Sequence, residues 1–129
     1  MIKQIKSSEI KNFIQENSNT VLLDVRTENE LKSLGKPKAE DLNSKTYFVT
    51  VSQDLSNWQV PDQNFIVNVK KKIGKDKKIL VMCAAGGRSM IAANLLENEG
   101  YSVLNVSDGY SGNNQDPGWK KSNLPIDNS

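Results

Sequence analysis

The chain has 129 residues, enough for one domain built around one hydrophobic core. Hydrophobic residues make up 36% and charged residues 25%, as in an ordinary globular protein. The net charge of +2 is too small to indicate that the protein binds nucleic acid. One cysteine and no histidine exclude an internal disulfide, Cys–His and Ser–His catalytic pairs, and most transition-metal sites.

No apolar run approaches the roughly 18 residues that a membrane span requires. The N-terminal segment also lacks the apolar stretch of a signal peptide. A lone cysteine favours a reducing compartment. We therefore expect a cytoplasmic protein with no membrane partner, no metal and no cofactor.

Predicted strands and helices alternate along the chain. In chain order they are a short edge strand at residues 3–5, a helix capped by Ser7 or Ser8, a strand at 21–25, a helix at 28–34, a loop at 35–45, a strand at 46–52, a helix from Asp62 to Gly74, a strand at 77–82, a helix at 89–100 and a strand at 101–107. This alternation indicates an α/β fold with a mainly parallel sheet.

The strongest local signals support this assignment. Residues 21–25 and 77–82 are nearly continuous apolar runs, as in parallel strands buried on both faces. Thr27 and Glu30 form a capping-box pattern at the start of the second helix. The helix at 89–100 is expected to bury four apolar side chains, those of Ile91, Ala92, Leu95 and Leu96.

The only cysteine, Cys83, lies where a predicted strand passes through a glycine-containing loop into a helix. Ligands bind at the carboxyl ends of the strands in open α/β sheets. A helix start adds unpaired N–H groups and the positive end of the helix dipole, which stabilise a thiolate nucleophile. The alternative is a small buried apolar cysteine, which we disfavour because nucleophile, glycines, arginine and helix start occur together in this order.

Three segments together carry a family resemblance. Cys83, four intervening residues, and then Arg88 and Ser89 form the first; a strand ending in Asp24 and Arg26 before an acidic helix forms the second. The third is residues 108–112 with 118–126, which the segment 113–117 separates. The ordered set resembles single-domain rhodanese-like sulfurtransferases. The resemblance implies one domain over residues 1–129, with a mainly parallel sheet of about five strands flanked by helices on both faces.

The resemblance also implies an activity, in which Cys83 carries sulfane sulfur as a persulfide from a donor to a thiophilic acceptor. The expected donor is a small sulfur compound or a persulfidated protein, and the expected acceptor is a thiol or another thiophile. Loop N–H groups would hold the persulfide anion as an oxyanion hole holds an oxygen. The expected binding residues are Ala84, Ala85, Gly86, Gly87, Arg88 and Ser89.

Other residues have two interpretations each. Arg88 would either clamp an anionic donor or, as we favour, pair with a carboxylate such as Asp24. Asp24 and Arg26 either support the loop through a polar network or belong to an ordinary strand-to-helix turn. Tyr110 and Trp119 either wall the pocket or, as we favour, pack in the core. Trp58 has no assigned role.

Two other functions are considered. A Cys-dependent phosphatase has five residues between cysteine and arginine, one more than this loop, because a phosphate monoester needs a wider cradle. A binding or regulatory module without turnover would fit the same fold. Relatives without activity usually lack the cysteine, and this chain has it.

Overall fold

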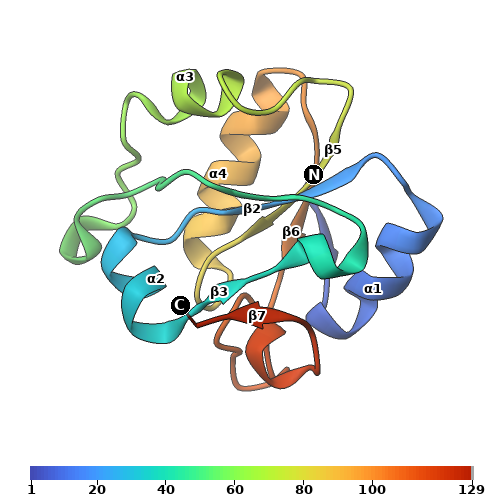
Figure 1. The fold of residues 1–129 in the computed structure, drawn as a ribbon. Helices are drawn as coiled ribbons and strands as arrows, with labels where there is room; N and C mark the ends of the chain where they lie inside the picture. The colour runs from blue at the N-terminus through green and yellow to red at the C-terminus, as the bar shows by residue number, and fades with distance from the viewer. Residues whose placement is uncertain (129) are drawn as a thin grey trace.

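The computed structural model describes residues 1–128, and at its centre lies a sheet of five parallel strands (Figure 1). The strands are β1 (Lys3–Ile5), β2 (Thr20–Asp24), β4 (Thr46–Phe48), β5 (Lys78–Met82) and β6 (Ser102–Val106). Their order in the sheet is β1-β6-β5-β2-β4, and every pairing between neighbours is parallel. The predicted α/β fold with a mainly parallel sheet of about five strands is confirmed.

Helices cover both faces of this sheet, as predicted. They are α1 (Ser7–Glu16), α2 (Glu28–Leu34), α3 (Phe65–Lys70) and α4 (Gly87–Asn98). In Figure 1, α3 and α4 lie on one side of the central strands, and α1 lies on the other side with the C-terminal segment. That segment adds β7 (Ile126–Asp127), which pairs antiparallel with β3 (Lys36–Pro37).

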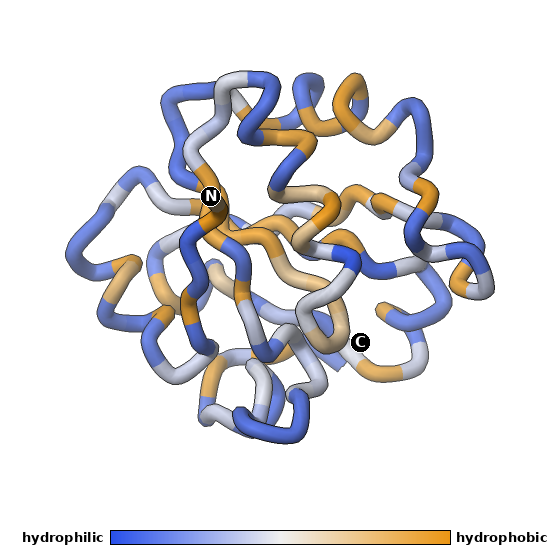
Figure 2. Tube along the Cα trace, turned by 180° about the vertical axis from the view of Figure 1, so that it is seen from behind, coloured by the Kyte–Doolittle hydropathy of each residue, from blue (hydrophilic) through white to orange (hydrophobic). Residues whose placement is uncertain are grey.

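The core is divided by the sheet into two layers. Leu23 of β2 and Val81 of β5 pack on the side of α3 and α4, whereas the alternate residues Leu22 and Leu80 pack with α1 and Trp119. Successive strand residues point to opposite faces, so strands buried on both faces need the continuous apolar runs that the sequence shows. In Figure 2 the central strands are coloured mainly as hydrophobic and most of the outer turns as hydrophilic.

Several predicted element bounds were wrong. The strand predicted at 46–52 ends at Phe48, although Val49 and Val51 still donate N–H bonds to Asp24 and Val25. The predicted loop at 35–45 contains β3 and a short 3₁₀ helix, η1 (Ala39–Leu42). The helix predicted from Asp62 begins at Phe65. Its predicted cap residue, Asp62, instead accepts a bond from the backbone N–H of Asn64.

Side-chain predictions in two helices also need correction. Ser7 does not cap α1, because both its N–H and its hydroxyl donate to the buried Asp108 carboxylate at 2.9 Å. Ser8 is not the cap either, since the residue preceding the helix is Lys6. In α4 the fully buried face contains Ala92 and Leu96 as predicted, whereas Ile91 and Leu95 are only partly buried.

Candidate active site

Cys83 follows β5 directly, and α4 begins at Gly87, so a loop of only four residues joins strand to helix. The Cys83 side chain is 1% exposed. Its Sγ accepts a hydrogen bond from the Gly86 N–H at 3.1 Å and lies 3.4 Å from Ser89 Oγ. The sulfur therefore lies at the N-terminus of α4, where unpaired N–H groups and the helix dipole favour negative charge.

Gly86 allows the loop to turn sharply from β5 into α4. Its φ is +110°, a left-handed conformation that side chains disfavour, and a Cβ there would collide with the Ser107 carbonyl oxygen. Further bonds tie the loop to the chain after β6. The carbonyl of Cys83 accepts the Tyr110 N–H at 2.8 Å, and the carbonyl of Ala84 accepts the Ser111 N–H at 2.9 Å. The loop is thus held in place by the segment that follows β6.

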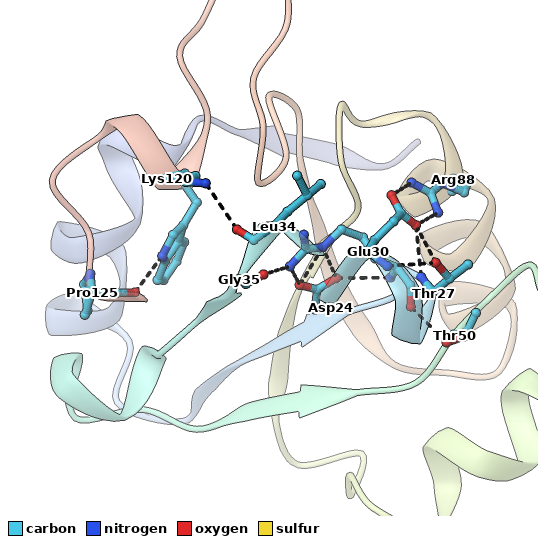
Figure 3. A network of polar contacts seen from close by, with 11 residues as sticks. Asp24, Thr27, Glu30, Leu34, Gly35, Thr50, Arg88, Lys120 and Pro125 are labelled. Carbon is cyan, nitrogen blue, oxygen red and sulfur yellow. Dashed lines mark hydrogen bonds and ion pairs between the residues drawn. The ribbon is translucent and has the colours of Figure 1, made fainter. Parts of the chain in front are cut away.

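Arg88 pairs with Glu30, not with Asp24 as the sequence suggested. Its Nη1 and Nη2 lie 2.7 and 2.8 Å from the two carboxylate oxygens, in the bidentate geometry that arginine favours (Figure 3). Burial alone would raise the pKa of Glu30, but hydrogen bonds from Arg88 and Thr27 and the charge of Arg88 lower it to about 2. The preferred interpretation of Arg88, a structural ion pair, is therefore supported, with a different partner.

Asp24 and Arg26 form a separate, fully buried ion pair below the loop. Arg26 Nη2 donates to Asp24 Oδ2 at 2.7 Å and to the Gly35 carbonyl at 3.0 Å. Its guanidinium lies 4.0 Å from the centre of the Tyr110 ring. Burial raises the pKa of Asp24, and the hydrogen bonds and charge of Arg26 act in the opposite direction. The pair supports the strand ends from inside the core and does not touch Sγ.

A cavity of about 320 Å³ opens above Cys83. It is lined by the loop and helix-start residues Ala84, Ala85, Gly87 and Arg88 and by two residues from another segment, Leu55 and Trp58. Sequence reasoning missed Leu55 and Trp58, which lie between β4 and α3 and far from Cys83 in sequence. A leucine and a tryptophan among the mostly polar residues 52–59 are the signal that could have found them.

Tyr110 and Trp119 are completely buried in the core, as favoured from the sequence, and neither lines the cavity at Cys83. The Trp119 Nε1–H donates to the Pro125 carbonyl at 2.8 Å (Figure 3). Because each aromatic side chain has its place in the packing, neither is available as a wall of the substrate pocket.

The segment 113–117 leaves the core and returns to it at nearly the same point. A Cβ on Gly118 would collide with Gly112, so the two glycines lie against each other although five residues separate them. Asp108 Oδ2 accepts the Gly118 N–H at 2.9 Å and fixes the junction. The two halves of the third sequence motif are therefore joined in space, with the inserted residues as an outward loop.

Across residues 1–128 no three cysteine or carboxylate side chains are grouped so as to hold a metal ion. Among the helices of the same residues, none is long and apolar enough to cross a membrane.

The Glu30–Arg88 pair should give the protein a specific acid sensitivity. The pKa of Glu30 is about 2 in the fold against an ordinary 4.5, so its stabilisation is complete above pH 4.5 and is lost as pH falls toward 2. We expect Glu30→Gln to lower the free energy of unfolding at pH 7 by about 1 to 2 kcal/mol. The difference from wild type should shrink below pH 4.5.

Urea denaturation at pH 7, 4.5 and 3 measures this. Glu28→Gln, at an exposed position in the same helix, is the matched control and should show no such pH dependence. A constant difference between Glu30→Gln and wild type across the three pH values would contradict the assignment.

Together these features define a class of protein: a parallel α/β domain whose single buried cysteine lies in a short loop at a helix N-terminus. Residues 7–116 match the rhodanese-like domain family, and the chain belongs to that family. An uncharacterised protein of Rickettsia prowazekii is 40% identical over 126 residues, which cover 97% of each chain.

Solved structures share the fold. A crystal structure of the Mycobacterium tuberculosis protein Rv0390 superposes with a TM-score of 0.83 at 24% identity, covering 98% of both chains. A polysulfide-sulfur transferase homodimer from Wolinella succinogenes superposes with a TM-score of 0.65 at 21% identity, over 97% of this chain and 77% of the other.

Proposed function

We propose that this rhodanese-like domain is a sulfurtransferase in which Cys83 carries one sulfane sulfur atom. The Cys83 thiolate attacks the outer sulfur of a donor. The bond between that sulfur and the rest of the donor breaks, and its electron pair leaves with the donor anion. A thiophilic acceptor then attacks the outer sulfur of Cys83–S–S⁻ and releases the thiolate.

The observation that carries this proposal is the surroundings of Cys83 Sγ. The Gly86 N–H points at the sulfur from 3.1 Å, Ser89 Oγ lies 3.4 Å away, and α4 starts beside both. Fixed donors at a helix N-terminus stabilise a thiolate and then the persulfide anion without reorganising during the reaction. Ala84, Ala85, Gly87 and Arg88 complete the ring of backbone around the added sulfur.

The donor class is part of the proposal. Polysulfide is a reasonable first candidate, because a protein of the same fold is named a polysulfide-sulfur transferase. A persulfidated donor protein is the second, and a thiol is the natural acceptor. These thiol reactions fit a reducing, cytoplasmic compartment.

The alternatives are less well supported. The short loop leaves too few N–H groups for the three non-bridging oxygens of a phosphoryl group, and an unsatisfied charged oxygen in a closed site costs several kcal/mol. A module without turnover would have no use for a thiol held against an N–H donor. Hydrolysis of an aryl phosphate that depends on Cys83 would favour the phosphatase instead.

Intact-mass spectrometry tests the proposal. Protein exposed to polysulfide and then freed of it should gain the mass of one sulfur atom, and a thiol acceptor should remove that mass. Cyanide should remove it as thiocyanate. Absence of the added sulfur with polysulfide and with a persulfidated protein would leave the non-catalytic module as the better description.

We expect weak turnover with thiosulfate and cyanide. Ala84 and Ala85 bring no cation to the loop, and the Arg88 guanidinium is already held by Glu30, so the thiosulfate dianion lacks a charged partner. One charge-assisted hydrogen bond to the dianion corresponds to about a tenfold change in kcat/KM, so wild type should be about tenfold poorer with thiosulfate than a variant with a cation in the loop.

Steady-state assays of wild type and of Ala84→Lys with thiosulfate check this expectation. The lysine should raise kcat/KM for thiosulfate, because it supplies the absent charge at the cavity wall. Equal kcat/KM for thiosulfate in wild type and Ala84→Lys would contradict it.

A further inference from the structure

A second and larger cavity, of about 620 Å³, lies between α2, the end of β4 and α3. In Figure 1 the chain that follows β4 runs between these two helices. Its wall carries four lysines and a single acidic residue, Glu28, above an apolar floor that includes Leu31, Phe48 and Val49. The four lysines are Lys32, Lys36, Lys71 and Lys72.

Two of these lysines, Lys71 and Lys72, belong to the basic run at residues 70–78. Lys70 forms an ion pair with Glu99 at 2.9 Å, and Lys78 donates to Asn17 Oδ1 at 3.1 Å. Among residues 1–126, no carboxylate forms an ion pair with Lys32, Lys71 or Lys72. Four lysines with a single carboxylate around one hollow attract an anionic occupant.

The cavity also contains an open edge of the main sheet. β4 is the last strand in the sheet order, and the N–H groups of Val49 and Val51 donate toward the chain of β2. Because alternate residues direct their backbone groups to opposite edges, those of Phe48 and Thr50 face away from β2. Both residues line the cavity, and the Phe48 carbonyl lies 3.4 Å from Lys72 Nζ. Exposed strand edges bind extended peptides through main-chain bonds.

A continuous surface connects this cavity with Cys83. Gln53 lines the lysine cavity and also a neighbouring hollow that includes Glu30 and Leu34. Leu55 lines that hollow and also the cavity at Cys83. A polypeptide bound along the β4 edge can therefore follow the surface to the sulfur site.

The cavity at Cys83 does not by itself offer a free charge to a small anionic donor, because Arg88 is paired with Glu30. A donor that obtains its binding energy elsewhere avoids this difficulty. We propose that the lysine-lined cavity docks an extended acidic segment of the protein that delivers persulfide sulfur to Cys83. This inference rests on the proposed sulfurtransferase function and names its donor class.

A synthetic peptide tests the docking site. The probe alternates glutamate and valine, carries fluorescein, and ends in a cysteine persulfide; a second peptide has glutamine in place of each glutamate. We expect fluorescence anisotropy to show binding of the acidic peptide only, weakening as salt rises. Lys71→Glu with Lys72→Glu should raise the Kd about tenfold, because two favourable charge interactions become repulsive.

The control variant combines Lys11→Glu with Lys121→Glu, two exposed lysines outside the cavity, and should bind the peptide nearly as wild type does. In spectra of labelled protein, the peptide should shift the amide signals of Phe48 and Thr50. The proposal would be overturned if both double variants bound the acidic peptide equally weakly. It would also be overturned if wild type bound the glutamine peptide as tightly as the acidic one. Tighter binding of single-stranded DNA or anionic vesicles at Lys71 and Lys72 would overturn it as well.

The same variants separate this proposal from the proposed function. Sulfur loading of Cys83 by polysulfide should be equal in wild type and Lys71→Glu/Lys72→Glu, whereas loading from the acidic persulfide peptide should slow about tenfold in that variant only. Failure of polysulfide loading in wild type, with peptide binding intact, would count against the sulfurtransferase and not against the docking site.

Discussion

Replacement of Cys83 by serine is expected to abolish persulfide formation and sulfur transfer. Cys83 is the only thiol in the chain, so no other residue can hold sulfane sulfur. A serine hydroxyl is not ionised near neutral pH, and no histidine is present to activate it. Intact mass after exposure to polysulfide should be unchanged in the variant, and thiocyanate formation should fall to the uncatalysed rate.

The fold should tolerate this change. Serine is only slightly smaller than cysteine. Its hydroxyl oxygen can accept the hydrogen bond that the Gly86 N–H donates to Sγ in the wild type. We expect a melting temperature within a few degrees of wild type. Added sulfur on Cys83→Ser, or transfer at near the wild-type rate, would show that sulfur is carried elsewhere or passed without a covalent intermediate.

The fold could be predicted largely because its signals are local. The apolar runs in β2 and β5 specify buried parallel strands, and the capping residues Thr27 and Glu30 mark the start of α2. The strand–loop–helix order around Cys83 places this residue at a helix N-terminus without any tertiary information. Each of these assignments depends on residues within a few positions of one another.

The missed features depend on residues distant in sequence. Glu30 and Arg88 are 58 positions apart, and nothing local distinguishes Glu30 from Asp24 as the partner. Glu30 also takes part in the capping box of its own helix, where it accepts the Thr27 N–H at 3.0 Å. This local role already explains a glutamate at position 30, so the sequence gives no reason to expect the ion pair with Arg88. Trp58 reaches the cavity only because the connection between β4 and α3 passes over the loop.

Ser7 shows the same effect at a helix end. Serine before a helical pattern predicts an N-cap. The carboxylate of Asp108, 101 positions away, instead takes the Ser7 N–H and hydroxyl. The same carboxylate joins the two sides of the inserted loop through Gly118. The sequence does not reveal that Asp108 accepts three hydrogen bonds from two distant segments, because these neighbours are brought together only by the folded sheet.

The buried pair of Asp24 and Arg26 carries the largest expected effect on stability. Both side chains are 0% exposed, and the carboxylate receives the Arg26 Nε and Nη2 groups at 2.7 to 3.0 Å. Asp24→Ala leaves the guanidinium buried without a counter-charge, which typically costs about 3–5 kcal/mol. Against the 5–15 kcal/mol of an ordinary domain, this is a large part of the total. Urea denaturation at pH 7 measures it.

A double variant distinguishes this cause from a general packing defect. Asp24→Leu with Arg26→Met replaces the pair by apolar side chains, a change that is often neutral when the volume is kept. We therefore expect the double variant to recover most of the stability that Asp24→Ala loses, and to keep polysulfide loading of Cys83, because neither side chain touches Sγ. A double variant as unstable as Asp24→Ala would show that the shape of this site, rather than an uncompensated charge, sets the cost. A double variant with normal stability that no longer accepts sulfur from polysulfide would instead show that the Asp24–Arg26 pair takes part in the reaction.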